Sequence, residues 1–466
     1  MQKYEVIKNI SYSLSANVVS LLVSVFMVMF VPKFLSVDEY GLWQLFLFYF
    51  SYLGFLHLGW EDGIYLRYAG KDFKDLNVKV MSGQFYSIFL LQIVLALLVT
   101  LGGRFLVGDP VKRLALFCAI WLAPIVNFNN LCNFIMQITN RIKDYAKMLF
   151  TEQIVFFFGV LLVITLGSAR FINMYYAKLL SVSAVFCIGA YTCRTLLKPD
   201  FDTLPRILAE ARINISVGSK LMFANIAGML IVGVIRYGIS IGWDVATFGR
   251  VSLTLGISNF LMVFITSVSV VFFPIIKSMD DEKRSEMYIK IRDALTVILF
   301  AALIGYYPLR FILGWWLPKY EDSLIYMSIL FPVCLFESKM SLLANSYLKS
   351  MREEVLIFQI NAVSVITSII LTVITVGILH DLDAAVLSIV IVSAFRCTFA
   401  EYFMEGLLHI SLTKEIITDF LMAGVFMITG WFLNNWLCTV IYAVAYTVFL
   451  FIYRNRVKNI VSFVRS

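Results

Sequence analysis

The sequence is built from long apolar stretches that are separated by short polar connections. An α-helix needs about 20 apolar residues to cross the hydrocarbon core of a bilayer, which is roughly 30 Å thick. By this length criterion the sequence predicts fourteen membrane-spanning helices. They lie near residues 10–34, 42–62, 80–103, 113–137, 149–167, 171–193, 217–241, 251–276, 292–314, 323–347, 355–379, 384–405, 416–434 and 436–453. The first stretch is too long for the apolar part of a cleaved signal peptide, so we expect it to remain as a span.

The composition requires that these stretches face lipid. Hydrophobic residues make up 61% of the 466 residues and charged residues 15%, whereas soluble domains are about 45–50% apolar and about 25% charged. A fold surrounded by water could not bury this much apolar surface, so the sequence predicts an all-α polytopic membrane protein. The longest connection, near residues 194–216, is too short for a folded domain. Any binding site must therefore lie within or between the helices.

The basic residues predict the orientation of the chain. Most of the 38 Lys and Arg residues fall on the cytoplasmic side if the N-terminus is inside, as the positive-inside rule requires. An even number of spans then puts both termini in the cytoplasm. The net charge of +8 is thus a topology signal, and we expect no nucleic-acid partner.

The two halves of the chain resemble each other at an offset of 208 residues. Ala16-Asn17-Val18 falls on Ala224-Asn225-Ile226, and Pro124 falls on Pro332. Polar positions of spans 4 and 10 coincide at the same offset, although chance identity between apolar segments is an alternative. The offset predicts two six-helix lobes in parallel repeat around a central cavity, the arrangement of many transporters. The expected lobes are residues 1–208 (spans 1–6) and 209–410 (spans 7–12), with spans 13 and 14 added in residues 411–466.

Polar side chains recur at helical spacing on several spans. Span 4 carries Asn130, Asn133 and Gln137 on one face, and spans 1 and 7 carry Asn17 and Asn225 at equivalent positions of the repeat. One interpretation is hydrogen bonding between helices, which contributes about 0.6 kcal/mol per bond. The other is a hydrophilic cavity, and we take these five residues as candidates for its lining.

Charged residues inside spans are costly and often functional. Arg236 lies on the same face of span 7 as Asn225, and Arg396 lies near the middle of span 12. Both are candidates for binding an anionic substrate, because a guanidinium donates two parallel hydrogen bonds to a phosphate. Snorkelling to the interface is the alternative for Arg236, and it is the favoured interpretation for Arg310 and Lys178. Glu337 and Lys339 in span 10 are candidates for coupling, with a local ion pair between them as the competing explanation.

Two acids stand at the predicted cytoplasmic end of span 2. Glu61 and Asp62 contribute nothing to positive-inside topology. We expect Glu61 to open and close a cytoplasmic gate by protonation or by pairing with a basic residue of the opposite lobe. An ordinary solvated helix end is the alternative.

Motifs of enzymes and metal sites are missing from the sequence. The seven cysteines form no CxxC pair, the three histidines are scattered, and no Walker A, GxSxG or HExxH motif occurs. The DxD pattern at Asp381 and Asp383 precedes a span, where capping of the helix is the favoured interpretation. We therefore expect no catalytic residues, no metal and no cofactor, and a protein that is not an enzyme.

Two segments carry a family resemblance. Residues 32–41 (PKFLSVDEYG) and 58–68 (LGWEDGIYLRY), together with the duplicated lobes, resemble the polysaccharide transporter (oligosaccharide flippase) branch of the multidrug/oligosaccharidyl-lipid/polysaccharide exporter superfamily. The resemblance implies a V-shaped pair of bundles around a cavity lined by spans 1, 2, 7 and 8. It also implies a bacterial inner-membrane flippase that moves polyprenyl-diphosphate-linked oligosaccharides for O-antigen, capsule or exopolysaccharide assembly, together with a polymerase and other assembly proteins.

Other substrates and functions remain open at this point. Lipid II flippases carry several arginines in span 1 and at the start of span 2, which are missing here, so lipid II is a less suitable substrate. A cation-coupled drug exporter of the same superfamily would need an acidic cavity, whereas the charges within these spans are mostly cationic. A membrane polysaccharide polymerase would need a large external loop, and the sequence offers none.

Overall fold

The computed structural model describes residues 18–260, 262, 276, 280–433 and 436–454. All regular elements in this part of the chain are helices, which confirms the all-α prediction. Nine of these helices are long and apolar enough to cross a membrane, or eleven if two bent pairs each count as one span. Every predicted span overlaps at least one described helix. The total of fourteen spans stays a prediction.

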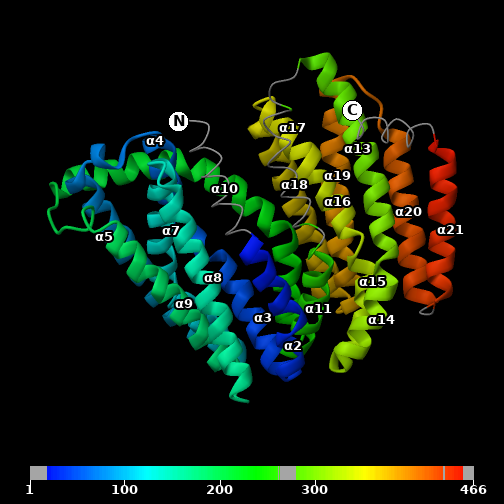
Figure 1. Cartoon of the computed structure of the whole chain (residues 1–466), viewed down its shortest axis with the longest axis horizontal. Coiled ribbons are helices and arrows are strands. Elements are labelled where there is room, and N and C mark those ends of the chain that lie inside the picture. The colour runs from blue at the N-terminus through cyan, green and yellow to red at the C-terminus, as the bar shows by residue number, and fades with distance from the viewer. Residues whose placement is uncertain (1–17, 261, 263–275, 277–279, 434–435, 455–466) are drawn as a thin grey trace. The chain divides into compact units, whose positions relative to one another are not determined.

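The chain forms two compact units, residues 1–226 and 227–466, and each is described by itself. The order of the first unit is evident from the colours in Figure 1. Its helices are Val18–Phe34, which contains α2 (Val31–Phe34), then α3 (Val37–Tyr52), η1 (Leu53–His57), α4 (Trp60–Tyr68), η2 (Phe73–Asp75), α5 (Val78–Leu106), α6 (Pro110–Ile120), α7 (Ala123–Ile138), α8 (Ile142–Thr165), α9 (Phe171–Thr192) and the first part of α10 (Leu204–Gly242).

Side-chain caps begin several of these helices. Ser36 Oγ accepts a hydrogen bond from the backbone N–H of Glu39 at the start of α3, and the Asn77 side chain does the same for Val80 at the start of α5. Asp109 caps α6, whose first residue is Pro110. Because the first N–H groups of a helix have no partner within it, such caps fix where each helix starts.

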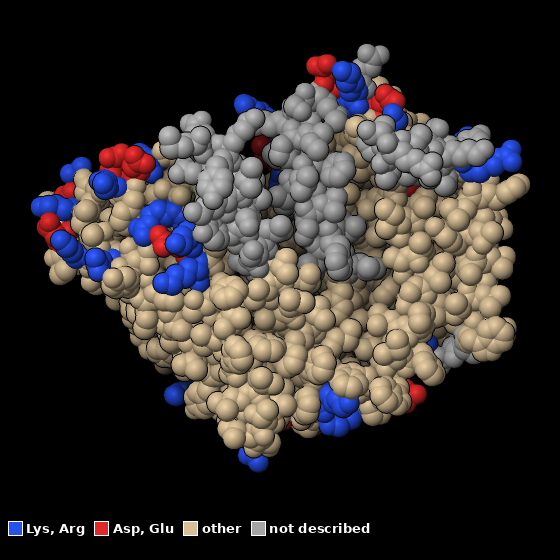
Figure 2. All heavy atoms as spheres, viewed as in Figure 1, with Lys and Arg blue, Asp and Glu red and all other residues tan. Residues whose placement is uncertain are grey.

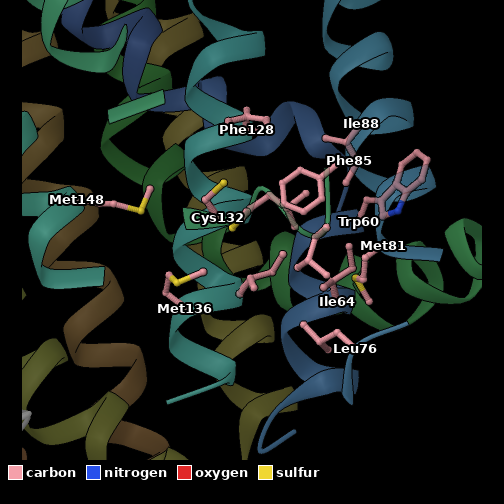
Figure 3. Close-up of a cluster of buried hydrophobic side chains, with 14 of the residues drawn as sticks. Trp60, Ile64, Leu76, Met81, Phe85, Ile88, Phe128, Cys132, Met136 and Met148 are labelled. Carbon is pink, nitrogen blue, oxygen red and sulfur yellow. The ribbon is translucent and has the colours of Figure 1, made fainter. Parts of the chain in front are cut away.

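The core of the first unit joins α4, α5 and α7. Trp60 and Ile64 of α4, Phe85 of α5, and Phe128 and Cys132 of α7 belong to one buried apolar cluster (Figure 3). Elsewhere in this unit α8 packs along α9, and α3 along α6. The core thus holds the short helix α4 between two long ones, and α4 carries Glu61 and Asp62.

The second unit begins within α10 and contains the remaining helices. They are α11 (Val245–Ser258), α13 (Asp281–Ile304), α14 (Tyr306–Trp316), η3 (Pro318–Ile325), α15 (Tyr326–Leu330), α16 (Val333–Lys339), η4 (Met340–Ala344), α17 (Asn345–Ser350), α18 (Glu354–Thr372), η5 (Val373–Ile378), α19 (Leu382–Leu408), α20 (Thr413–Phe432) and α21 (Leu437–Ile452). Here α18 packs along α19, α20 along α21, and α16 against α19.

One predicted connection is shorter than expected. The sequence predicts that residues 194–216 link two spans, but α10 already begins at Leu204. The predicted connection is too long because it treats Pro205 as a residue that cannot lie in a helix. A proline disrupts the interior of a helix, but it is tolerated in the first turn, where the backbone N–H has no partner within the helix. Pro205 is the second residue of α10, so it marks the start of the helix.

The surface of each unit matches a bilayer environment. Charged side chains gather near helix ends, and the surface between them on the face in Figure 2 is almost free of charge. Large apolar side chains are exposed along the long helices, for example Leu90 and Leu98 of α5 and Leu162 of α8. In water such a surface would favour aggregation, whereas lipid chains solvate it at no cost.

Candidate functional site

The second predicted span is broken before its acidic residues. Leu58 and Gly59 both have positive φ values, 56° and 82°, and the segments Val37–His57 and Trp60–Tyr68 meet at an angle of 58°. The N–H of Gly59 donates a hydrogen bond of 2.9 Å to Nδ1 of His57. Glycine adopts positive φ at little cost, so Gly59 permits the chain to turn here and to start α4 in a new direction.

The two acids in the first turn of α4 are buried. Glu61 has no exposed surface, and among the described residues neither of its carboxylate oxygens has a hydrogen-bond partner. Asp62 is 7% exposed, and its Oδ2 lies 3.7 Å from Nε2 of His57. Because Nδ1 of His57 accepts from Gly59, the neutral ring carries its proton on Nε2, facing Asp62. The interpretation of Glu61 and Asp62 as a solvated helix end is therefore wrong.

A polar network beside these acids connects α4 to α5 and α10. Trp60 Nε1 donates to Oε1 of Gln84 at 2.6 Å, and the Asn214 amide donates to the same oxygen at 3.2 Å. Arg67 Nη1 in turn donates to Asn214 at 2.5 Å and to Glu210 at 2.8 Å. This network could not be predicted from the sequence, because its α10 members, Glu210 and Asn214, lie more than 120 residues along the chain from its members on α4 and α5. The sequence does contain one indication of the contact between α4 and α10, the glycines at positions 59 and 63. Small residues four positions apart allow the backbones of two membrane helices to approach closely.

The polar stripe predicted on span 4 lies on α7. Asn127 is fully buried, and its amide donates to the carbonyl of Leu53 and to Oε1 of Gln92, both at 3.0 Å. Asn127 lies one turn before Asn130 on the same face of the helix, and it serves the hydrogen bonding between helices that was one interpretation of the stripe. The candidate cavity residues of the stripe are half-buried: Asn130, Asn133 and Gln137.

The other two candidate cavity residues, Asn17 and Asn225, occupy equivalent positions of the proposed repeat. Asn225 is exposed on α10. Asn17 lies outside the described residues. The assignment of these asparagines to a cavity stays a prediction.

Arg396 is held by two neighbouring helices. Its Nη1 donates to Oε2 of Glu337 on α16 at 3.0 Å, and its Nε donates to Oδ1 of Asn361 on α18 at 3.0 Å. The Arg396 side chain is 9% exposed, whereas the Glu337 side chain is 21% exposed. Glu337 therefore neutralises Arg396, and an anion that binds this guanidinium must compete with the carboxylate.

Arg236 makes a separate set of contacts on α10. Its Nη2 donates to Oγ of Ser252 at 3.1 Å, and its guanidinium lies 5.4 Å from the ring centre of Phe248. Both partners belong to α11. Arg236 is half-buried, so its guanidinium is placed by neighbouring side chains of the same unit.

Lys339 takes part in a buried ionic cluster of four residues, Arg292, Lys339, Glu401 and Asp419, one each from α13, α16, α19 and α20. Arg292 binds Glu401 through two hydrogen bonds of 2.7 and 3.0 Å and Asp419 through one of 2.7 Å. Lys339 binds the same oxygen of Asp419. These side chains are at most 4% exposed. Two cations face two anions, so the ionic cluster is neutral as a whole.

The structure changes the interpretation of Glu337, Lys339 and Lys178. Lys339 pairs with Asp419, and Glu337 pairs with Arg396, so the local ion pair between positions 337 and 339 is not formed. Lys178 is buried and binds Glu152 at 2.7 Å, so it does not snorkel. The charge of each residue is satisfied by another helix rather than by solvent.

The predictions about capping and metals can also be compared with the structure. Asp381 caps α19 by accepting hydrogen bonds from the N–H groups of Asp383 and Ala384, as predicted. In the part of the chain that the structure describes, no three His, Cys, Asp or Glu side chains are grouped so that they could hold a metal ion.

Comparison with known proteins identifies the fold. No protein-family model and no curated protein matches the sequence. The chain is similar to the lipid II flippase MurJ in an inward closed conformation, with 14% identity and a TM-score of 0.64, over 97% of this chain and 100% of that one. It is also similar to an inward-facing multidrug resistance MATE family transporter of the MOP superfamily, with 15% identity and a TM-score of 0.55, over 84% and 98% of the two chains.

A third match is a MATE protein in complex with MaL6, with 13% identity and a TM-score of 0.50, over 84% of this chain and 93% of that one. At such identities the likeness concerns the fold. The fold that the resemblance of segments 32–41 and 58–68 implies is confirmed: the chain has the fold of the MurJ flippase and MATE transporter structures.

Proposed function

We propose that this protein is a flippase that moves polyprenyl-diphosphate-linked oligosaccharide units across the bacterial cytoplasmic membrane for surface polysaccharide assembly. The observation that carries the proposal is a fold shared with a lipid II flippase and MATE transporters, combined with arginines placed at helix interiors. In this proposal both termini are cytoplasmic, and a polysaccharide polymerase and other assembly proteins receive the product.

Arg396 and Arg236 are the proposed contacts for the diphosphate. A diphosphate needs several charge-assisted hydrogen bonds to leave water, and a guanidinium supplies two in one plane. Arg396 is oriented by Asn361 and paired with Glu337, and Arg236 is held by Ser252 and Phe248. The half-buried amides of Asn130, Asn133 and Gln137, with Asn17 and Asn225, are the proposed contacts for sugar hydroxyls.

Glu61 is the proposed gate and coupling group. A carboxylate at zero exposure without a hydrogen-bond partner among the described residues is stable only if a proton or cation accompanies it. Asp62 and His57 beside it offer a second acid and a second proton carrier. We infer that movement of a proton or cation to Glu61 accompanies the conformational change, which the membrane gradient then drives.

The test is flipping in proteoliposomes. The substrate is a fluorescent oligosaccharide on a polyprenyl diphosphate, and its arrival at the outer surface is measured by a lectin that cannot cross the membrane. We expect transport by the wild type, none by Arg396→Gln, and normal transport by Glu286→Gln, which removes one carboxylate of the exposed pair with Lys290 on α13. Equal transport by the wild type and Arg396→Gln would contradict the proposed diphosphate contact.

A cation-coupled drug exporter is the second candidate. The observation that favours it is the buried acid pair of α4, since acids are the groups that bind organic cations. The same proteoliposomes distinguish the two: a drug exporter moves a fluorescent organic cation and leaves the lipid-linked oligosaccharide in place.

A further inference from the structure

A cavity of about 730 Å³ lies in the second unit, between α14, η3 and the start of α21. Its volume is within the range of small-molecule sites, about 300–1,000 Å³. Among its lining residues are Tyr307, Arg310, Glu321, Asp322, Trp436 and Thr439. From the sequence, Arg310 is expected to snorkel, and Glu321 and Asp322 have no predicted role.

The cavity presents both signs of charge. Arg310 is half-buried on α14, and its Nη1 donates a hydrogen bond of 3.1 Å to the hydroxyl of the buried Tyr306, which fixes the guanidinium. Glu321 and Asp322 are exposed on η3. Among the described residues, no ion pair of Arg310 with either acid is formed, so the two charges lie in one cavity and remain available to a ligand.

The rim of the cavity is apolar and aromatic. Phe311 is 81% exposed and Trp436 73% exposed, and both line the cavity. Exposed aromatic side chains at the end of a membrane helix lie at the level of the lipid headgroups. The mouth of the cavity is therefore at the depth where headgroups and the first carbons of acyl chains lie.

We propose that this cavity binds the headgroup of a zwitterionic phospholipid that carries a primary ammonium group, such as phosphatidylethanolamine. The phosphate binds Arg310, the ammonium donates hydrogen bonds to Glu321 and Asp322, and the acyl chains lie against Phe311 and Trp436. A phosphatidylglycerol headgroup would bring no cation to the two acids. A choline headgroup carries its charge but has no N–H with which to donate.

The experiment uses the full-length protein, purified in detergent and mixed with phosphatidylethanolamine, phosphatidylcholine or phosphatidylglycerol of identical acyl chains. Bound lipid is counted by native mass spectrometry. We expect phosphatidylethanolamine to be retained about tenfold more than the other two, the effect of one charge-assisted hydrogen bond. Equal retention of the three lipids, or a preference for phosphatidylglycerol, would overturn the proposal.

Variants assign the two ends of the headgroup. Glu321→Gln with Asp322→Asn should remove the preference for phosphatidylethanolamine over phosphatidylcholine, and Arg310→Gln should weaken retention of both. Lys319→Gln removes a charge from η3 outside the cavity lining and should keep the preference. The acids are exposed, so their replacement preserves the fold, which a monodisperse protein peak verifies. A preference that survives the double replacement would assign the lipid to another site.

Discussion

At the scale of single residues, the second unit pairs its buried charges across helices. Arg396 pairs with Glu337, and the ionic cluster sets Arg292 and Lys339 against Glu401 and Asp419. The cost of placing ions in a medium of low dielectric constant is several kcal/mol each and is offset only by close partners. Removing one partner therefore leaves the other as an uncompensated buried charge. This penalty lowers stability more than the loss of the bond itself does.

The ionic cluster yields a prediction about stability. Lys339→Met leaves one cation with two carboxylates, so we expect a loss of about 3–5 kcal/mol in the free energy of unfolding. The double variant Lys339→Met/Asp419→Asn restores neutrality around Arg292 and Glu401 and should recover most of this loss. Thermal unfolding of the purified variants in detergent measures both. Additive losses in the double variant would show that charge balance does not determine the stability of the ionic cluster.

The Arg396–Glu337 pair yields a prediction about affinity that depends on the proposed function. Glu337 competes with an incoming diphosphate for the guanidinium, and a hydrogen bond to a charged group contributes about 1.5–3 kcal/mol. Glu337→Gln should therefore tighten the binding of a short polyprenyl diphosphate about tenfold, and Arg396→Gln should weaken it by about the same factor.

The matched control for this prediction is Glu286→Gln, which removes one carboxylate of the exposed pair with Lys290 on α13. It should leave the affinity for the diphosphate unchanged. Microscale thermophoresis with the labelled protein gives the dissociation constants. Weaker binding by Glu337→Gln would show that Glu337 orients Arg396 for the ligand and does not compete with it.

At the scale of helices, α4 and α10 approach each other so closely that side chains do not fit between them. A Cβ atom on Gly63 would lie 1.9 Å from the carbonyl oxygen of Asn214, and one on Gly218 would lie 2.0 Å from that of Gly59. Arg67 of α4 donates to Glu210 and Asn214 of α10, and Gln84 of α5 connects the two helices by accepting from Trp60 and Asn214. The position of α4, which carries the buried acids Glu61 and Asp62, therefore depends on Gly63 and Gly218.

Gly63→Ala should consequently separate α4 from α10. The clash is with backbone, which cannot rotate away, so we expect the first unit to lose about 1–3 kcal/mol of stability, as overpacked interiors do. Gly102→Ala on α5 is the control, because only the tip of Leu106 lies near its Cβ position, at 4.0 Å. Thermal unfolding compares the two variants. If both lose the same stability, the close approach of α4 and α10 has no energetic importance.

The helices themselves could be predicted from the sequence because hydropathy is a local property, and each span needs only its own residues. The partners of the buried charges could not. Arg292 lies 109 residues from Glu401 and 127 from Asp419, and no local pattern connects them. Arg292 was also missed because the predicted span starts at this residue, where a charge is ordinary, whereas α13 begins at Asp281 and makes Arg292 internal.

At the scale of the whole molecule, the proposed repeat agrees with a local feature of each unit. Pro124 lies in the first turn of α7, and Pro332, at an offset of 208 residues, directly precedes α16. A proline is tolerated at a helix start and not further in, so each marks a point where a span restarts after a turn. A repeat of even span number gives both units the same orientation in the membrane, and that orientation is testable.

The last prediction concerns this orientation. Lys198 lies between α9 and α10, on the predicted cytoplasmic side, whereas Lys319 and Leu379 lie on the predicted outer side, and all three are exposed. In a variant without the seven native cysteines, Lys319→Cys and Leu379→Cys should react with a membrane-impermeant maleimide in intact cells. Lys198→Cys should react only after the cells are opened, because the basic residues hold that connection inside. Labelling of Lys319→Cys but not of Leu379→Cys would mean an odd number of crossings between the two positions. The parallel orientation of the two units, and with it the predicted count of fourteen spans, would then be wrong.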